Sequence, residues 1–124
     1  MRSNRAAFAI LALFSFALLL FAGGGPGFRT RDLLDDHYAK HRREFGSITK
    51  QQYLHMAQHL RDSRPGRDIL ESRRPGGGGA KFDRRRGWFV AYDGDGAIRT
   101  FFIPAEGIRY FESQARNYRG SSRR

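Results

Sequence analysis

The chain has 124 residues, and its 23 Lys and Arg residues against 12 Asp and Glu residues leave a net charge of +11 at pH 7. This length excludes a multidomain enzyme, and the absence of cysteine excludes a disulfide scaffold and any cysteine-ligated zinc or iron–sulfur site. The basic excess, almost all of it arginine, indicates a polyanionic partner such as nucleic acid, anionic lipid or an acidic polymer, because a positive surface attracts such molecules.

The N-terminal segment has the pattern of an export signal. Arg2 and Arg5 precede an uncharged run, residues 6–22, and a stretch rich in glycine follows. This order is typical of a secretory signal peptide, and the run also reaches the lower limit of about 17 residues that span a bilayer. We therefore predict a cleaved signal or a membrane anchor over residues 1–27, with a buried helix as a third interpretation. In the first two cases the rest of the chain is exported, and it is either secreted or periplasmic, or held at the membrane by residues 6–22.

Residues 28–118 are predicted to form a single α+β domain that begins with two helices. The first helix runs from a cap at Thr30 or Asp32 to about Glu44. The second follows a T-x-x-Q capping box at 49–52, in which two side chains satisfy two backbone N–H groups. Its apolar stripe has helical spacing and consists of Tyr53, Met56, Ala57 and Leu60.

A small antiparallel sheet of three or four strands is predicted after the helices. The expected strands are 68–73, 81–83, 88–92 and 98–103, and a D-G-D-G hairpin signal precedes the last of them. The glycine-rich residues 75–79 are predicted to be a flexible loop. The pattern over 108–118 leaves helix and other structure open, and residues 119–124 are predicted to be a disordered basic tail.

Two histidines of the first helix are candidates for acid–base chemistry. His37 and His41 are one helical turn apart, so both imidazoles reach one place. Because the pair lacks the adjacent Glu of a zincin and no third ligand is evident, we predict no metal site. Imidazole titrates near neutral pH, and a pair can therefore supply one base and one acid. The alternative is that one of them packs in the core with a hydrogen bond.

The last predicted strand carries the next two candidates, Arg99 and Thr100. Strict alternation along a strand places Ile98 and Thr100 on one face and Arg99 on the other. Because both faces are partly apolar, we expect a central strand that is covered on both sides. Arg99 then needs an anionic partner, which is either a protein carboxylate or a ligand phosphate.

The turn before the third strand combines basic and aromatic residues. Arg84, Arg85 and Arg86 precede Trp88. This combination suits contacts with the backbone and bases of single-stranded nucleic acid, so these residues are candidates for substrate binding. A solvated turn is the alternative.

Several motifs also occur in a characteristic order. They are H-x-x-K-H over 37–41, E-F-G over 44–46, Tyr53 with Met56-Ala57, Arg73-Arg74, and Tyr92 followed by D-G-x-I-R-T-x-F-x-P over 95–104. This series resembles the C-terminal ribonuclease domains of bacterial polymorphic and contact-dependent inhibition toxins, which have the barnase/EndoU/colicin/RelE-like fold. The resemblance covers roughly residues 32–112. It implies cleavage of RNA without a metal or cofactor, a histidine of the first helix with Arg99 and Thr100 around the scissile phosphate, and an immunity protein as a partner.

The sequence thus supports two hypotheses. In the first, the chain is an exported ribonuclease of toxin type, in which the 2′-OH of RNA is the nucleophile and His37 or His41 is the base. Arg99 and Lys40 stabilise the charge of the transition state, and Thr100 donates a hydrogen bond. In the second, the chain is a non-catalytic basic protein of the cell envelope that binds an acidic polymer, a lipid or a protein. Neither hypothesis predicts the oligomeric state.

Overall fold

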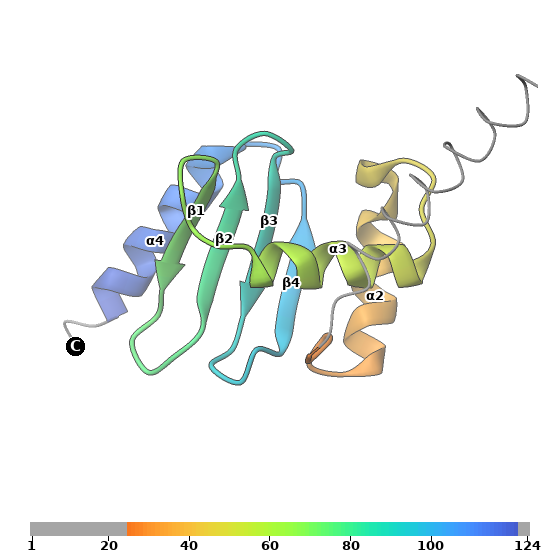
Figure 1. Ribbon diagram of the computed structural model, residues 1–124, viewed down its shortest axis with the longest axis horizontal. Helices are drawn as coiled ribbons and strands as arrows, with labels where there is room; N and C mark the ends of the chain where they lie inside the picture. The colour runs from red at the N-terminus through yellow and green to blue at the C-terminus, as the bar shows by residue number, and fades with distance from the viewer. Residues whose placement is uncertain (1–24, 122–124) are drawn as a thin grey trace, which may run out of the picture.

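The computed structural model describes residues 25–121, which form an α+β domain of three α-helices and a four-stranded antiparallel sheet (Figure 1). The predicted α+β class is therefore confirmed, and so are the two helices before the sheet. A third helix follows the sheet, where the sequence pattern left the structure open. The predicted export segment lies outside the described residues, apart from residues 25–27. Within residues 25–121, no helix is long and apolar enough to cross a membrane.

The two helices before the sheet start where the capping residues predict. The first, α2 (Arg31–His41), begins at Thr30, whose side-chain oxygen accepts a hydrogen bond from a backbone N–H of the first turn. It ends earlier than predicted, and a 3₁₀ helix, η1 (Arg42–Phe45), continues the chain. The second, α3 (Lys50–Asp62), begins with the predicted capping box.

The four strands follow one another in an antiparallel meander, in the order β1-β2-β3-β4. They are β1 (Ile69–Arg73), β2 (Gly79–Asp83), β3 (Trp88–Tyr92) and β4 (Ile98–Phe102). The glycine-rich segment between β1 and β2 is a tight, packed turn, in which Arg74 N donates to Gly78 O at 2.9 Å. A Cβ on Gly78 would clash with Tyr92 O, so the segment predicted to be a flexible loop packs against the turn after β3.

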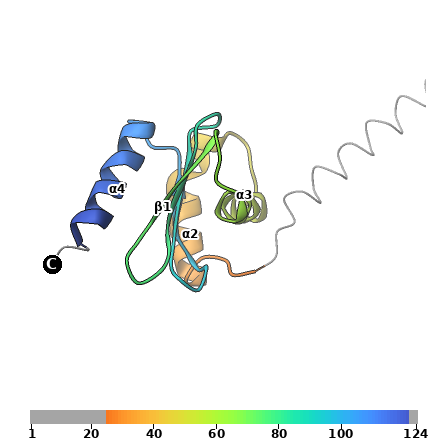
Figure 2. The ribbon, with the colours of Figure 1, turned by 60° about the vertical axis from the view of Figure 1, so that its left-hand side comes forward.

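Helices cover both faces of the sheet (Figure 2). α3 lies on one face, and its predicted apolar stripe supplies half of the main core, which consists of Tyr53, Ala57, Leu60, Val90, Ile98 and Phe101. The third helix, α4 (Ile108–Ser121), lies on the other face over β1 and β2. Its Phe111 packs against Phe82 and Phe89. Because α4 reaches Ser121, residues 119–121 are helical and not part of a disordered tail.

A β-bulge in β4 decides where Arg99 points. Ile98 and Thr100 pair with consecutive residues of β3, so Arg99 is the extra residue of the bulge. Ile98 and Phe101 both pack in the core under α3, although strict alternation would separate them. Thr100 contacts α2. Arg99 lies close enough to Tyr118 of α4 for its positive charge to act on the pKa of that tyrosine. The prediction that Arg99 and Thr100 lie on opposite faces is therefore wrong, because the bulge turns both of them away from α3.

Candidate functional site

The candidate site lies at β4, on the face of the sheet that α4 covers only in part. α4 runs over β1 and β2, whereas α2 packs beside β4 (Figure 1). Thr100 and Phe102 of β4 are half-buried on this face, and His37 and His41 of α2 reach them from the side. The structure thus brings together three of the four predicted catalytic residues, from segments about sixty residues apart.

His37 meets Thr100 directly. Its Nδ1 atom lies 3.3 Å from Thr100 Oγ1, within hydrogen-bond distance. Burial lowers the pKa of His37, and the positive charges of His41 and Lys40 lower it further. His37 therefore favours the neutral form. Its Nε2 atom makes no polar contact with any residue in the range 25–121, and this atom is the one left to exchange a proton.

His41 is held by a carboxylate that sequence reasoning missed. Its ring stacks on Phe102, with centroids 5.1 Å apart, and on His37, with centroids 5.7 Å apart. Its Nδ1 lies 2.6 Å from Glu44 Oε2, while Glu44 Oε1 accepts a hydrogen bond of 2.8 Å from the backbone N–H of Ile103. Glu44 thus joins α2 to the end of β4 and fixes the His41 ring.

The sequence contains one signal for this role. Glu44 follows His41 by three residues, the spacing at which side chains on a helix meet. The bond to Ile103, which anchors the carboxylate, has no sequence signal.

Arg99 is the fourth predicted catalytic residue, and it is turned towards a protein carboxylate. Its Nε donates to Asp93 Oδ1 at 2.5 Å, and 61% of its side chain is exposed. The expectation of a central strand that is covered on both sides is therefore wrong, because β4 is at the edge of the sheet and leaves Arg99 exposed. Burial acts to raise the pKa of Asp93, but hydrogen bonds from Arg99, Arg74 and Arg29 outweigh it and lower the pKa to about 2.

The predicted substrate-binding residues lie in two places. Lys40 is exposed on α2, close enough to His37 to lower its pKa. Residues 84–86 form the exposed turn between β2 and β3, where buried Asp83 accepts hydrogen bonds from two backbone N–H groups and from Arg86 Nη1. Trp88 is half-buried in the core beneath α3, with the Arg86 guanidinium 5.2 Å from its ring centre. Its ring is thus less open to a base than the sequence suggests.

The described part of the chain holds no group of three His, Asp or Glu side chains arranged for a metal ion. What the site does offer is two imidazoles, a hydroxyl and a guanidinium at one edge of the sheet. No protein-family model matches the chain. No curated protein matches it either. The geometry of these side chains is therefore the evidence for a function.

Proposed function

We propose that the chain is an exported endoribonuclease that cleaves RNA by attack of the 2′-OH on the adjacent phosphate. The observation that carries this proposal is the contact of His37 with Thr100, with His41 stacked beside it. A neutral base, a second histidine and a hydroxyl donor are the groups that this reaction requires within reach of one phosphate.

The two histidines differ in a way that suggests their roles. With Nδ1–H donating to Thr100 Oγ1, the free Nε2 of neutral His37 takes the proton of the 2′-OH. The 2′-oxygen then forms a bond to phosphorus, and the bond from phosphorus to the 5′-oxygen breaks. His41, with Nδ1–H held by Glu44, supplies a proton from Nε2 to that leaving oxygen. The products are a 2′,3′-cyclic phosphate and a free 5′-OH.

The hydroxyl and the arginine act on the phosphate. When Thr100 accepts from His37, its own hydrogen is free to bond a phosphate oxygen. Arg99 lies next to it on the same face, and its exposed guanidinium places positive charge where the transition state gains negative charge. Lys40, exposed beside His37, adds to this field.

The test is cleavage of a mixed-sequence RNA oligonucleotide by the purified full-length chain in mild detergent with EDTA. His37→Ala and His41→Ala, prepared in the same way, are each expected to lower the rate at least about 100-fold. An oligonucleotide with 2′-deoxyribose throughout is expected to remain intact. Absence of cleavage, or equal cleavage by all three proteins, refutes the proposal.

A second candidate function is binding without catalysis, by a basic protein of the envelope with an acidic polymer, a lipid or a protein as its partner. It is favoured by the ion pair between Arg99 and Asp93, which gives this arginine a partner within the protein. Salt-sensitive binding of RNA with no turnover in the same assay supports this function over the first.

A further inference from the structure

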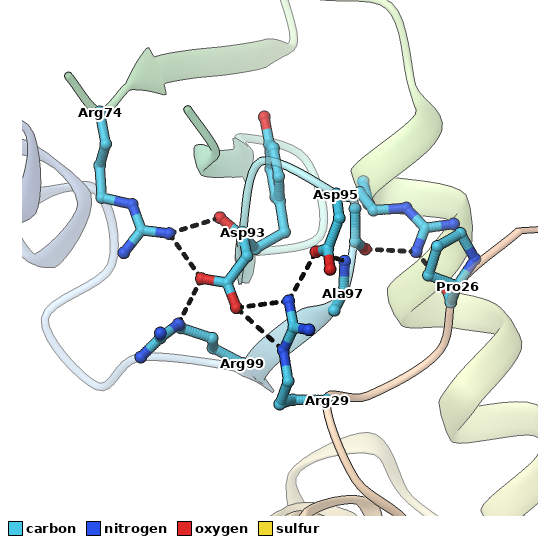
Figure 3. Close-up of polar contacts among 10 residues, drawn as sticks. Pro26, Arg29, Arg74, Asp93, Asp95, Ala97 and Arg99 are labelled. Atoms are coloured by element: carbon cyan, nitrogen blue, oxygen red, sulfur yellow. Dashed lines mark hydrogen bonds and ion pairs between the residues drawn. The ribbon is translucent and has the colours of Figure 1, made fainter. Parts of the chain in front are cut away.

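Asp93, in the turn after β3, gathers arginines from three separate parts of the chain (Figure 3). Its Oδ1 accepts hydrogen bonds from Arg99 Nε at 2.5 Å and from Arg74 Nη2 at 2.9 Å. Its Oδ2 accepts two from Arg29, one from Nη2 at 2.9 Å and one from Nε at 3.2 Å. Arg74 and Arg99 approach the carboxylate from the same side, and Arg29 approaches from the other. Two guanidinium groups are thereby fixed side by side on one oxygen atom.

Both of these guanidinium groups have donors to spare. The two terminal nitrogens of Arg99, and Nη1 of Arg74, make no polar contact within residues 25–121. The Arg74 guanidinium carbon lies 5.7 Å from the ring centre of Tyr118 on α4, which holds the plane of the group in place. With Asp93 and Asp95 counted against the three arginines, one positive charge remains uncompensated.

Stability alone accounts poorly for this cluster. The Arg99 side chain is 61% exposed, and an exposed ion pair contributes only about 0–1 kcal/mol, whereas Arg74 and Asp93 are 27% and 16% exposed. Arg99 is held through Nε, so its two terminal nitrogens can donate in parallel to two oxygens of one phosphate. The open donors of Arg99 are therefore better explained by binding of an anion than by a contribution to stability.

The cluster is continuous with the candidate site. Arg99 is followed by Thr100, whose hydroxyl meets His37. Arg99 thus lies between the proposed scissile phosphate at Thr100 and the guanidinium of Arg74. Because Arg99 and Arg74 share Asp93 Oδ1, a strand bound at the histidines that also contacts Arg99 would come next to Arg74.

We propose that Arg74, with Arg99 beside it on one oxygen of Asp93, forms a second phosphate subsite, which binds the phosphate next to the scissile one in single-stranded RNA. That the RNA is a substrate rests on the proposed function, whereas the binding of its second phosphate at Arg74 does not. Asp93 is a positioning residue in this subsite, because it holds both guanidinium groups in one orientation.

The experiment uses the full-length chain and 2′-O-methyl RNA, which cannot be cleaved because its nucleophile is blocked. A dinucleotide carries one phosphate and a trinucleotide carries two, and the affinity of each is measured by NMR titration or displacement of a labelled probe. The wild type is expected to bind the trinucleotide about tenfold more tightly than the dinucleotide. Arg74→Gln is expected to abolish this gain, to leave the dinucleotide affinity unchanged, and to reduce the salt dependence of trinucleotide binding by about one unit.

Arg109→Gln, at an exposed position of α4, is the matched control, because it removes the same charge away from the subsite. An Arg74→Gln protein that keeps the tenfold gain, or loses no more than the control, overturns the proposal. So does a wild type for which the second phosphate adds no affinity.

Asp93→Ala supplies a test of opposite sign, because alanine lacks the oxygen that holds Arg74 and Arg99, whereas the amide oxygen of asparagine would still accept from both. On a surface that is merely basic, removal of a negative charge strengthens binding, whereas loss of a positioning residue weakens it. We expect the trinucleotide to bind several-fold more weakly, with thermal unfolding measured to verify that the variant is folded; tighter binding overturns the proposal. Because neither probe is cleaved, failure of the subsite and failure of the ribonuclease proposal are read from different measurements.

Discussion

Replacement of Glu44 by Gln removes one negative charge and keeps the shape of the side chain, because one carboxylate oxygen is replaced by an NH₂ group. In the wild type, Oε1 accepts from Ile103 N and Oε2 faces Nδ1 of His41, which is only 12% exposed. In Glu44→Gln, the amide oxygen keeps the bond to Ile103, and the NH₂ group then faces His41 and cannot accept its proton. The imidazole therefore loses the bond that fixes which nitrogen is protonated.

The size of the effect follows from the bond that is lost. A hydrogen bond to a charged group contributes about 1.5–3 kcal/mol, and about 1.4 kcal/mol corresponds to tenfold in rate, so kcat is expected to fall about 10- to 150-fold. KM is expected to stay the same, because Glu44 does not contact the substrate in the proposed reaction. A role in folding alone would instead lower the unfolding temperature and leave the kcat of the folded fraction intact.

The assay is steady-state cleavage of a fluorogenic RNA, with thermal unfolding recorded for each protein. Glu112→Gln, at an exposed position of α4, serves as the control for loss of one negative charge. If Glu44→Gln retains more than half of the wild-type kcat, or if Glu112→Gln loses as much, then Glu44 does not position His41.

Two further predictions concern stability. Gly78→Ala is expected to lower the free energy of unfolding by about 1–3 kcal/mol more than Gly76→Ala, as measured by urea denaturation. Both glycines have positive φ, but only at Gly78 would a Cβ meet backbone atoms of Tyr92 and Asp93; equal losses would mean that the clash is relieved without cost. Burial and neighbouring positive charge lower the pKa of His37 in the folded state, so the unfolded chain binds this proton more readily. The His37 contribution to stability is therefore present above about pH 6.5 and decreases as the pH falls towards the lower folded-state pKa. His37→Gln is expected to flatten the pH dependence of the unfolding free energy in this window, and an unchanged slope contradicts the assignment.

Local features of the fold follow directly from the sequence. The cap at Thr30, the capping box at 49–52 and the apolar stripe of α3 involve residues within one or two helical turns, so their spacing is enough to predict them. The hairpin at 93–96 is equally local. The same reasoning predicts that His37 and His41 lie together, since one helical turn separates them.

Other features depend on pairing between distant segments. The bulge at Arg99 exists only because Ile98 and Thr100 take consecutive partners on β3, and it puts Thr100 on the same face as Arg99, where alternation would separate them. Glu44 acquires its role from the backbone N–H of Ile103, and Asp93 from arginines on both sides of it in the chain.

The sequence by itself therefore determined the basic charge, the α+β class, the two capped helices before the sheet and the proximity of the two histidines. Only the tertiary structure decided that Thr100 meets His37, that Arg99 shares its face, and that a carboxylate holds each of His41 and Arg99. The physical reason is the distance along the chain over which each kind of interaction acts. Helical spacing and turn chemistry act over a few residues, whereas the strand register and the packing of α2 beside β4 join groups about sixty residues apart, which no local pattern records.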